Sequence, residues 1–154
     1  MQRRHFLQTG SALGAMGLVS GCATVGGGSG PKVVVIGGGY SGATAAKYLR
    51  MWSDHKIQVT LVEPNDTFIS CPISNLVIGG SKTIADITTP YDNLTKRHGV
   101  KIVKDRVNSI DADKRIVKLA GGTELAYDRL IVSAGIDFMW ETLPGMNKAG
   151  AKDK

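Results

Sequence analysis

Two apolar runs early in the chain form the pattern from which its fold is predicted. Residues 32–36 read Lys-Val-Val-Val-Ile, and residues 57–62 read Ile-Gln-Val-Thr-Leu-Val. Short runs rich in β-branched side chains predict strands. Between them, residues 43–50 have a composition typical of a helix. The pattern therefore predicts a strand, a helix and a second strand, which is the βαβ unit of a parallel sheet.

A glycine-rich turn joins the first strand to the helix. Gly37, Gly39 and Gly42 have the spacing of the turn that binds dinucleotides. In that turn the first glycine permits the sharp bend, the second lets a pyrophosphate approach the backbone, and the third lets the helix pack closely on the sheet. We expect the helix to begin near Tyr40 and Ser41, where free N–H groups and the positive end of the helix dipole face the phosphates.

An acidic residue, Glu63, follows the second strand, roughly 20 residues beyond the third glycine. A carboxylate there can accept hydrogen bonds from the hydroxyls of the adenosine ribose, and it repels a 2′-phosphate. This argues against NADP. Because the strands, turn, helix and acid occur together, we predict a dinucleotide site. A structural glycine loop in another kind of α/β domain is the alternative.

The second half of the chain alternates between helix and strand patterns. Residues 91–98 read as a helix that starts after Pro90 and is ended by Gly99. An alternating strand is expected over residues 100–107. A small antiparallel β-meander is then expected, with strands at residues 107–110, 115–119 and 123–125.

The last predicted strand, residues 127–135, is buried and opens on the small residues Ser133, Ala134 and Gly135. This segment resembles the corresponding one of two-dinucleotide-domain flavoproteins, in which small residues let the pyrophosphate side of the flavin approach. The predicted fold is therefore α/β, a Rossmann-like FAD-binding domain with a parallel sheet, a crossover helix and a small β-meander. Its boundaries are expected at residues 32–145, with a polar tail at residues 146–154.

Composition narrows the classes of function without selecting one. The chain has 154 residues, 42% of them hydrophobic and 21% charged, which suits one globular domain. The formal net charge of +6 includes Arg3 and Arg4 of the first segment, so the remaining excess favours an acidic partner without predicting a nucleic-acid surface. His5, His55 and His98 are scattered, and with two cysteines they predict no metal site.

The first 22 residues are predicted to be an export signal. Arg3 and Arg4 precede Phe-Leu, and residues 9–19 form a weakly apolar stretch. That stretch is too short and too rich in glycine to span a membrane, so the pattern favours a twin-arginine signal. Gln2 and Gln8 depart from the usual residues of that signal. We therefore expect a periplasmic protein.

Cys22 closes the signal and can be interpreted in two ways. Residues 19–22 resemble a lipoprotein processing box, in which Cys22 becomes the lipid-bearing N-terminus and residues 23–31 form a flexible linker. Plain cleavage near this point is the alternative, and we favour the lipid anchor. The twin-arginine route carries folded proteins, and NADH is scarce outside the cytoplasm. The bound cofactor is therefore expected to be FAD rather than a diffusing nicotinamide.

Several segments together resemble the flavoprotein subunit of flavocytochrome c sulfide dehydrogenase. The likeness extends over about residues 32–145. The segments that carry it are Glu63-Pro64-Asn65, then Cys71, then Ser-Asn-Leu-Val-Ile-Gly-Gly at residues 74–80, with Gly-Ala-Thr-Ala-Ala-Lys-Tyr at residues 42–48 and Tyr-Asp-Arg at residues 127–129.

This resemblance implies roles for three positions. Cys71 corresponds to the cysteine that is bonded to the 8-methyl carbon of the flavin, and a thiolate is a suitable nucleophile for an electron-poor ring. The alternative is an inert buried thiol. Val107 matches the position whose backbone meets the adenine, with an exposed-edge valine as the alternative. Ser133 and Ala134 stand where related flavoproteins usually have alanine and threonine.

The resemblance also implies an activity: oxidation of a small sulfur substrate, sulfide, with electrons passing through covalently bound FAD to a c-type cytochrome subunit. In that family the sulfur-handling cysteine pair lies in a second half that has no counterpart here. We therefore assign no catalytic residue in this chain. Two alternatives stay open, a sulfide:quinone or NADH:quinone oxidoreductase relative with non-covalent FAD, and an inactive FAD-binding module.

Overall fold

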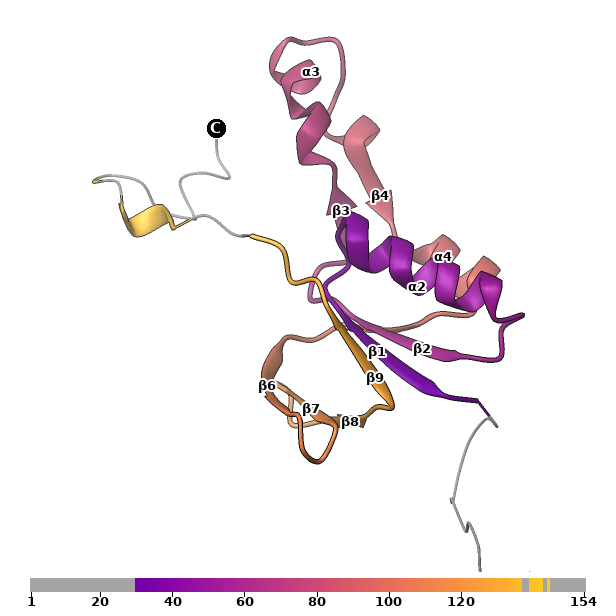
Figure 1. Ribbon diagram of the computed structural model, residues 1–154. Coiled ribbons are helices and arrows are strands. Elements are labelled where there is room, and N and C mark those ends of the chain that lie inside the picture. Colours follow the sequence, from indigo (N-terminus) through magenta and orange to yellow (C-terminus); the bar gives the residue numbers. More distant parts are fainter. Residues whose placement is uncertain (1–29, 137–138, 143, 145–154) are drawn as a thin grey trace, which may run out of the picture.

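A four-stranded parallel sheet forms the centre of the fold (Figure 1). The computed structural model describes residues 30–136, 139–142 and 144. The strand order is β5-β2-β1-β9, and every neighbouring pair runs parallel. The strands are β1 Lys32–Ile36, β2 Gln58–Val62, β5 Lys101–Val103 and β9 Arg129–Val132.

The two faces of the sheet are covered by different elements (Figure 1). On one face lie α2 (Tyr40–Trp52), which connects β1 to β2, and α4 (Asp92–His98). On the other lies an antiparallel meander of β6 (Val107–Asp111), β7 (Ile116–Leu119) and β8 (Glu124–Ala126). A strand buried on both faces reads as a continuous apolar run, which explains the composition of β1.

Successive side chains of β1 enter different cores because they alternate across a strand. Val33 and Val35 pack under the helices, whereas Val34 and Ile36 pack against the meander. The three valines are at most 5% exposed, and Ile36 is 9% exposed. The short β1 therefore anchors both hydrophobic cores, and it fixes the turn that follows it.

Residues 67–90 form an arm that projects from the body of the domain (Figure 1). Its base is an antiparallel pair, β3 (Thr67–Ile69) with β4 (Thr88–Pro90). Between these strands lie the short helices η1 (Cys71–Ile73), α3 (Ser74–Ile78) and η2 (Ala85–Ile87), and a further one, η3 (Trp140–Thr142), lies beyond the sheet. The arm exposes much of its apolar surface, including Ile69, Leu76, Ile78 and Ile84.

The predicted α/β fold, with its parallel sheet, crossover helix and β-meander, is confirmed. The prediction that the last strand is buried was wrong, because β9 lies at an edge of the sheet and Val132 is 61% exposed. The helix ended by Gly99 is also confirmed, since Gly99 has a φ of 63° and closes α4. The strand predicted over residues 100–107 was wrong in part. It breaks after Val103, because the Asp105 carboxylate accepts the N–H groups of Arg106 and Gly121 and stabilises a bend. Val107 therefore begins a strand of the meander.

Arg50, near the end of α2, donates hydrogen bonds to the chain at the ends of α2 and α4. Its Nε donates to the carbonyl of His98 at 2.8 Å, and its Nη1 donates to the carbonyls of His55 at 2.6 Å and Ile57 at 2.5 Å. His55 and Asp54 have left-handed backbones, with φ values of 60° and 49°. The guanidinium therefore stabilises a turn that these residues adopt only at a cost. His55 and His98, which are scattered in the sequence, lie together here.

Replacing Arg50 with methionine is expected to lower the free energy of unfolding by about 2–3 kcal/mol, because three carbonyl acceptors lose a charged donor. Urea denaturation followed by circular dichroism measures this change. The matched control is Arg97→Met. Arg97 is exposed on α4, and its side chain makes no hydrogen bond or ion pair within the described residues, so the substitution should change stability by at most about 0.5 kcal/mol. Equal effects of the two substitutions would contradict this role of Arg50.

Candidate functional site

The carboxyl ends of the parallel strands meet at one edge of the sheet, where they form a cleft of about 510 Å³. Here β1 has β2 on one side and β9 on the other, which is the switch point where open α/β sheets bind ligands. We call this space the nucleotide cleft. It brings together residues that the sequence assigned to a cofactor from four separate segments: Gly37, Glu63, Val107, Ala134 and Gly135.

Two glycines of the turn are required by the packing of the protein itself. Gly37 has a φ of 96°, and a Cβ there would lie 2.2 Å from the carbonyl oxygen of Ser133. A Cβ on Gly42 would lie 1.8 Å from the carbonyl oxygen of Gly37. Any side chain at either position would push α2 or β9 away from the turn. These two glycines therefore set how closely the helix approaches the sheet.

Gly39 differs from its two neighbours in the motif. It has an ordinary backbone conformation, with φ −66° and ψ −169°, that any residue can adopt. A Cβ there would meet no atom nearer than the ring of Phe68 at 3.9 Å, which is a normal contact. Nothing in the described part of the protein therefore requires a glycine at this position. A glycine here leaves the backbone open to a group that approaches from outside, as a pyrophosphate does.

Glu63 is held rigidly at the mouth of the cleft. It is 8% exposed, and its Oε2 accepts the N–H of Gly38 at 2.7 Å. Its Oε1 accepts the backbone N–H of Asn65 at 2.9 Å and the side-chain amide of Asn65 at 2.7 Å. A carboxylate offers about four acceptor positions. A position therefore remains that can accept a ribose hydroxyl, and Asn65 fixes the direction in which it points.

Tyr91, which sequence reasoning treated only as the start of a helix, contacts the glycine turn from the opposite side. Its hydroxyl donates to the carbonyl oxygen of Gly38 at 3.0 Å. Burial, together with the negative charge of Glu63, raises the pKa of Tyr91 to about 12. The hydroxyl therefore keeps its proton near neutral pH. No local signal in the sequence could identify this contact, because residues 38 and 91 meet only in the folded chain.

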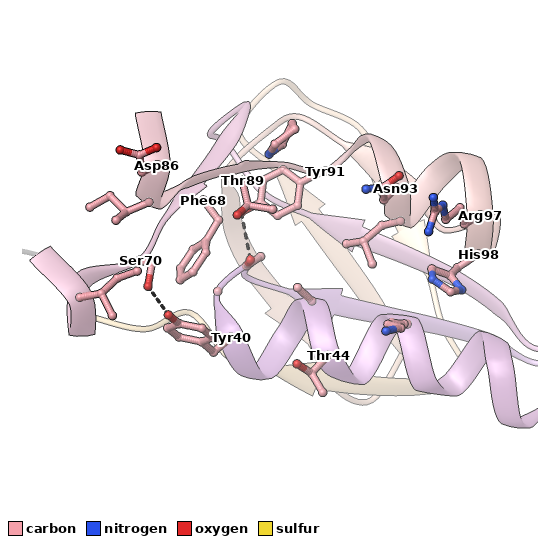
Figure 2. A pocket seen from close by; sticks show the side chains of 18 residues that line it. Tyr40, Thr44, Phe68, Ser70, Asp86, Thr89, Tyr91, Asn93, Arg97 and His98 are labelled. Carbon is pink, nitrogen blue, oxygen red and sulfur yellow. Dashed lines mark hydrogen bonds between the residues drawn. The ribbon is translucent and has the colours of Figure 1, made fainter. Parts of the chain in front are cut away.

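Tyr40 and Ser41 begin α2, as expected, but the side chain of Tyr40 does not line the nucleotide cleft. It lines a second pocket of about 540 Å³ between α2, α4 and the base of the arm, which Figure 2 shows. There the Tyr40 hydroxyl bonds to the Ser70 hydroxyl, and its ring packs edge-on against Phe68 with centroids 4.8 Å apart. Ser41 is exposed. What these two residues can offer the nucleotide cleft is their backbone N–H groups.

Cys71 is exposed at the start of η1 and does not line the nucleotide cleft. It is nevertheless connected to the glycine turn by a short series of contacts. Ser70 precedes it, the Ser70 hydroxyl bonds to Tyr40, and Tyr40 follows Gly39. A ligand that extends from Glu63 past Gly39 along this series reaches the arm. The thiol is exposed in this arm, next to Ser70.

Ser133, at the end of β9, has a hydroxyl that is buried without a hydrogen-bond partner among the described residues. It lies against Gly42, where an added Cβ would be 2.9 Å from the Ser133 hydroxyl oxygen. The position accommodates a small side chain, but the hydroxyl of that side chain makes no hydrogen bond within the described residues.

Other expectations concern parts of the chain that the structure does not describe. The export signal, Cys22, the linker up to residue 29 and the tail at residues 146–154 lie outside the described residues. In the part that is described, no helix has the length and apolarity needed to cross a membrane. The same part contains no cluster of histidine, cysteine and acidic side chains suited to a metal ion.

Comparisons with known proteins show the family to which this chain belongs. A family model described as pyridine nucleotide-disulphide oxidoreductase matches residues 31–154. The mitochondrial sulfide:quinone oxidoreductase of Dictyostelium discoideum is 30% identical over 117 residues, which are 76% of this chain and 26% of that protein. The flavoprotein chain of the flavocytochrome c sulfide dehydrogenase of Chlorobaculum thiosulfatiphilum is 59% identical over 46 residues, which are 30% of this chain and 94% of that sequence.

Solved structures agree with this assignment. The sulfide:quinone oxidoreductase of Aquifex aeolicus superposes with a TM-score of 0.63 at 28% identity, over 71% of this chain and 25% of that one. This chain thus spans about a quarter of the length of the sulfide:quinone oxidoreductases that it matches. The matched family consists of FAD-binding flavoproteins. The residues present fit such a cofactor, because the space over Gly39 and the free acceptor position of Glu63 have no use within the described protein.

Replacing Gly39 with alanine is expected to leave the fold intact and to weaken FAD binding by at least about tenfold, because the methyl group occupies the approach of the pyrophosphate. Stability should stay the same or rise by about 0.5 kcal/mol, since alanine restricts the unfolded chain. Isothermal calorimetry with FAD and thermal denaturation measure the two effects.

Two further glycines serve as controls for Gly39. Gly79→Ala, in the arm, should bind FAD like the unmodified chain, because a Cβ there meets only the Asn75 carbonyl at 3.3 Å. Gly42→Ala should fail to fold, since its Cβ would overlap the backbone of Gly37. Normal FAD binding by the Gly39→Ala variant would show that no phosphate approaches this point.

Replacing Ser133 with alanine is expected to raise the free energy of unfolding by about 1 kcal/mol, because a buried hydroxyl without a partner is removed. FAD affinity should not change. Denaturation in urea checks the first expectation, with Ser109→Ala on the exposed face of β6 as the control that should show no gain. A loss of FAD affinity would instead mean that the Ser133 hydroxyl binds the cofactor.

Proposed function

Because this chain belongs to the pyridine nucleotide-disulphide oxidoreductase family, we propose that it is the FAD-binding part of a sulfide-oxidising flavoprotein. The observation that carries FAD binding is the glycine turn, in which Gly39 has no protein neighbour that requires it, together with the buried Glu63 at the nucleotide cleft. The flavin, when bound, supplies two-electron oxidation. The residues of this chain bind it, orient it and hold it in place.

Each end of the cofactor has its own contacts in this proposal. The carboxylate of Glu63 accepts a hydroxyl of the adenosine ribose, and the backbone of Val107 borders the adenine. The N–H groups at the start of α2 meet the pyrophosphate, since the first N–H groups of a helix have no partner within it. Glu63 also sets the preference for an unphosphorylated ribose, because a 2′-phosphate would be repelled.

We assign to Cys71 the covalent attachment of the flavin. The thioether joins Sγ to the 8-methyl carbon, the thiol and the methyl group each lose one hydrogen, and the two electrons pass to the flavin, from which its electron acceptor removes them. Three observations support this assignment: the thiol is exposed, it follows Ser70 at the base of the arm, and Ser70 contacts the start of α2. A covalent bond would keep the cofactor from being lost after export.

The partners follow from the similarity to the sulfide dehydrogenase flavoprotein chain, which is 59% identical over its short match. We propose a c-type cytochrome subunit as the electron acceptor and a small sulfur compound as the substrate. We further propose export by the twin-arginine route to the periplasm, with a lipid anchor on Cys22. The sulfur-handling residues would lie in polypeptide that corresponds to the rest of the relatives' length.

A second candidate function is that of a quinone-reducing relative with non-covalent FAD. It is favoured by the extent of the similarity to the sulfide:quinone oxidoreductase of Dictyostelium discoideum, which covers 76% of this chain. A type II NADH:quinone oxidoreductase of Staphylococcus saprophyticus is also similar, at 28% identity over 116 residues. In these cases the flavin would be released when the protein is denatured.

The intact mass of the protein, purified from its native host under denaturing conditions, separates these candidates. We expect a mass that includes one covalently bound flavin and the lipid of a processed Cys22. The flavin mass should disappear in Cys71→Ser and persist in Ser70→Ala, the matched control beside it. Flavin that is present before denaturation and absent from the denatured protein would favour the quinone-reducing alternative. Protein that never carries flavin would contradict the proposed binding of FAD.

A further inference from the structure

Three hydrogen bonds hold the glycine turn. The N–H of Gly37 donates to the carbonyl of Val62 at 2.9 Å, and the N–H of Gly38 donates to Glu63 at 2.7 Å. Both of these bonds come from β2 and its end. The third bond, from the hydroxyl of Tyr91 to the carbonyl of Gly38, comes from the start of α4 on the helix-covered side. Figure 2 shows it as a dashed line across the second pocket.

The third bond determines the direction of the next N–H group. The carbonyl of Gly38 and the N–H of Gly39 belong to one planar trans peptide, so they point in opposite directions. Because Tyr91 holds the carbonyl toward α4, the N–H of Gly39 is turned away from α4. This N–H donates to no acceptor among the described residues.

Tyr91 is well suited to hold this carbonyl. Its side chain is 8% exposed and packs in the core under the helices with Val33, Leu61 and Val100. Its own backbone is fixed, because its carbonyl accepts the N–H of Leu94 in the first turn of α4. Since Glu63 faces the same turn, its charge further disfavours ionisation of the phenol. The hydroxyl is therefore a stationary, permanently protonated donor.

We propose that Tyr91 is a positioning residue of the FAD site: by binding the carbonyl of Gly38, it turns the N–H of Gly39 toward the pyrophosphate. The inference rests on the proposed binding of FAD. Tyr91 does not touch the cofactor, and it lies about 50 residues along the chain from the turn that it orients. The bond from its hydroxyl holds the Gly38–Gly39 peptide in one orientation. The peptide therefore loses less conformational freedom when the nucleotide binds.

The test replaces Tyr91 with phenylalanine in the full chain, which removes only the hydroxyl. FAD and ADP affinities are measured by calorimetry well below the unfolding temperature, because ADP comprises the part of FAD that meets Glu63 and the glycine turn. We expect both affinities to fall about tenfold in Tyr91→Phe. In the protein without nucleotide, the residual dipolar coupling of the Gly39 N–H in ¹⁵N-labelled samples should change, which reports a new direction of that bond.

Two controls separate this effect from a general loss of stability. Tyr127→Phe alters a half-buried tyrosine in the core beside the meander and should leave affinity and coupling unchanged. Val117→Ala removes methyl groups from a fully buried site in that core, so it should lower the unfolding temperature without lowering affinity. Nucleotide affinity of Tyr91→Phe within twofold of the unmodified chain would overturn the inference alone. If the unmodified chain binds neither FAD nor ADP, the proposed function fails, and the inference with it.

Discussion

The close approach of α2 to the turn after β1 is the constraint on which the rest of the site depends. Gly42 packs on the carbonyl of Gly37 so tightly that a Cβ would lie 1.8 Å from it. This contact places the first N–H groups of the helix at the edge of the sheet, between the ends of β2 and β9. A helix that stood farther from the sheet would carry the same N–H groups away from Glu63. The site is therefore a consequence of backbone packing before any side chain contributes.

Two spaces lie beside the glycine turn, in which Gly37 lines the nucleotide cleft and Gly38 and Gly39 line the second pocket. On one side lies the nucleotide cleft, with Glu63 and the ends of the strands. On the other lies the pocket lined by Tyr40, Phe68 and Tyr91, which supports the turn from behind. The binding surface is made largely of backbone, whereas the support is made of aromatic side chains. If FAD binds as proposed, a substitution behind the turn would change its binding without touching it.

Features encoded over short stretches of sequence could be predicted, and those that depend on distant contacts could not. The β1 strand, the glycine turn and Glu63 lie in one segment of about 30 residues whose spacing has a direct physical meaning. The meander follows from alternation and turn residues. The elements of the arm could not be predicted, because its short helices lack any apolar periodicity. The bend at Asp105 and the bond from Tyr91 each join segments that only the folded chain brings together.

The position of β9 has a consequence for the order of folding. This strand pairs with β1, and the N–H of Lys32 bonds to the Asp128 carboxylate across a sequence separation of 96 residues. Closing so long a loop is slow compared with forming α2 or the meander, which involve neighbours. One wall of the cleft, formed by Ala134 and Gly135, comes into place only with this pairing. A growing chain would therefore complete this wall of the cleft only after the residues of β9 have emerged, well after β1 and α2.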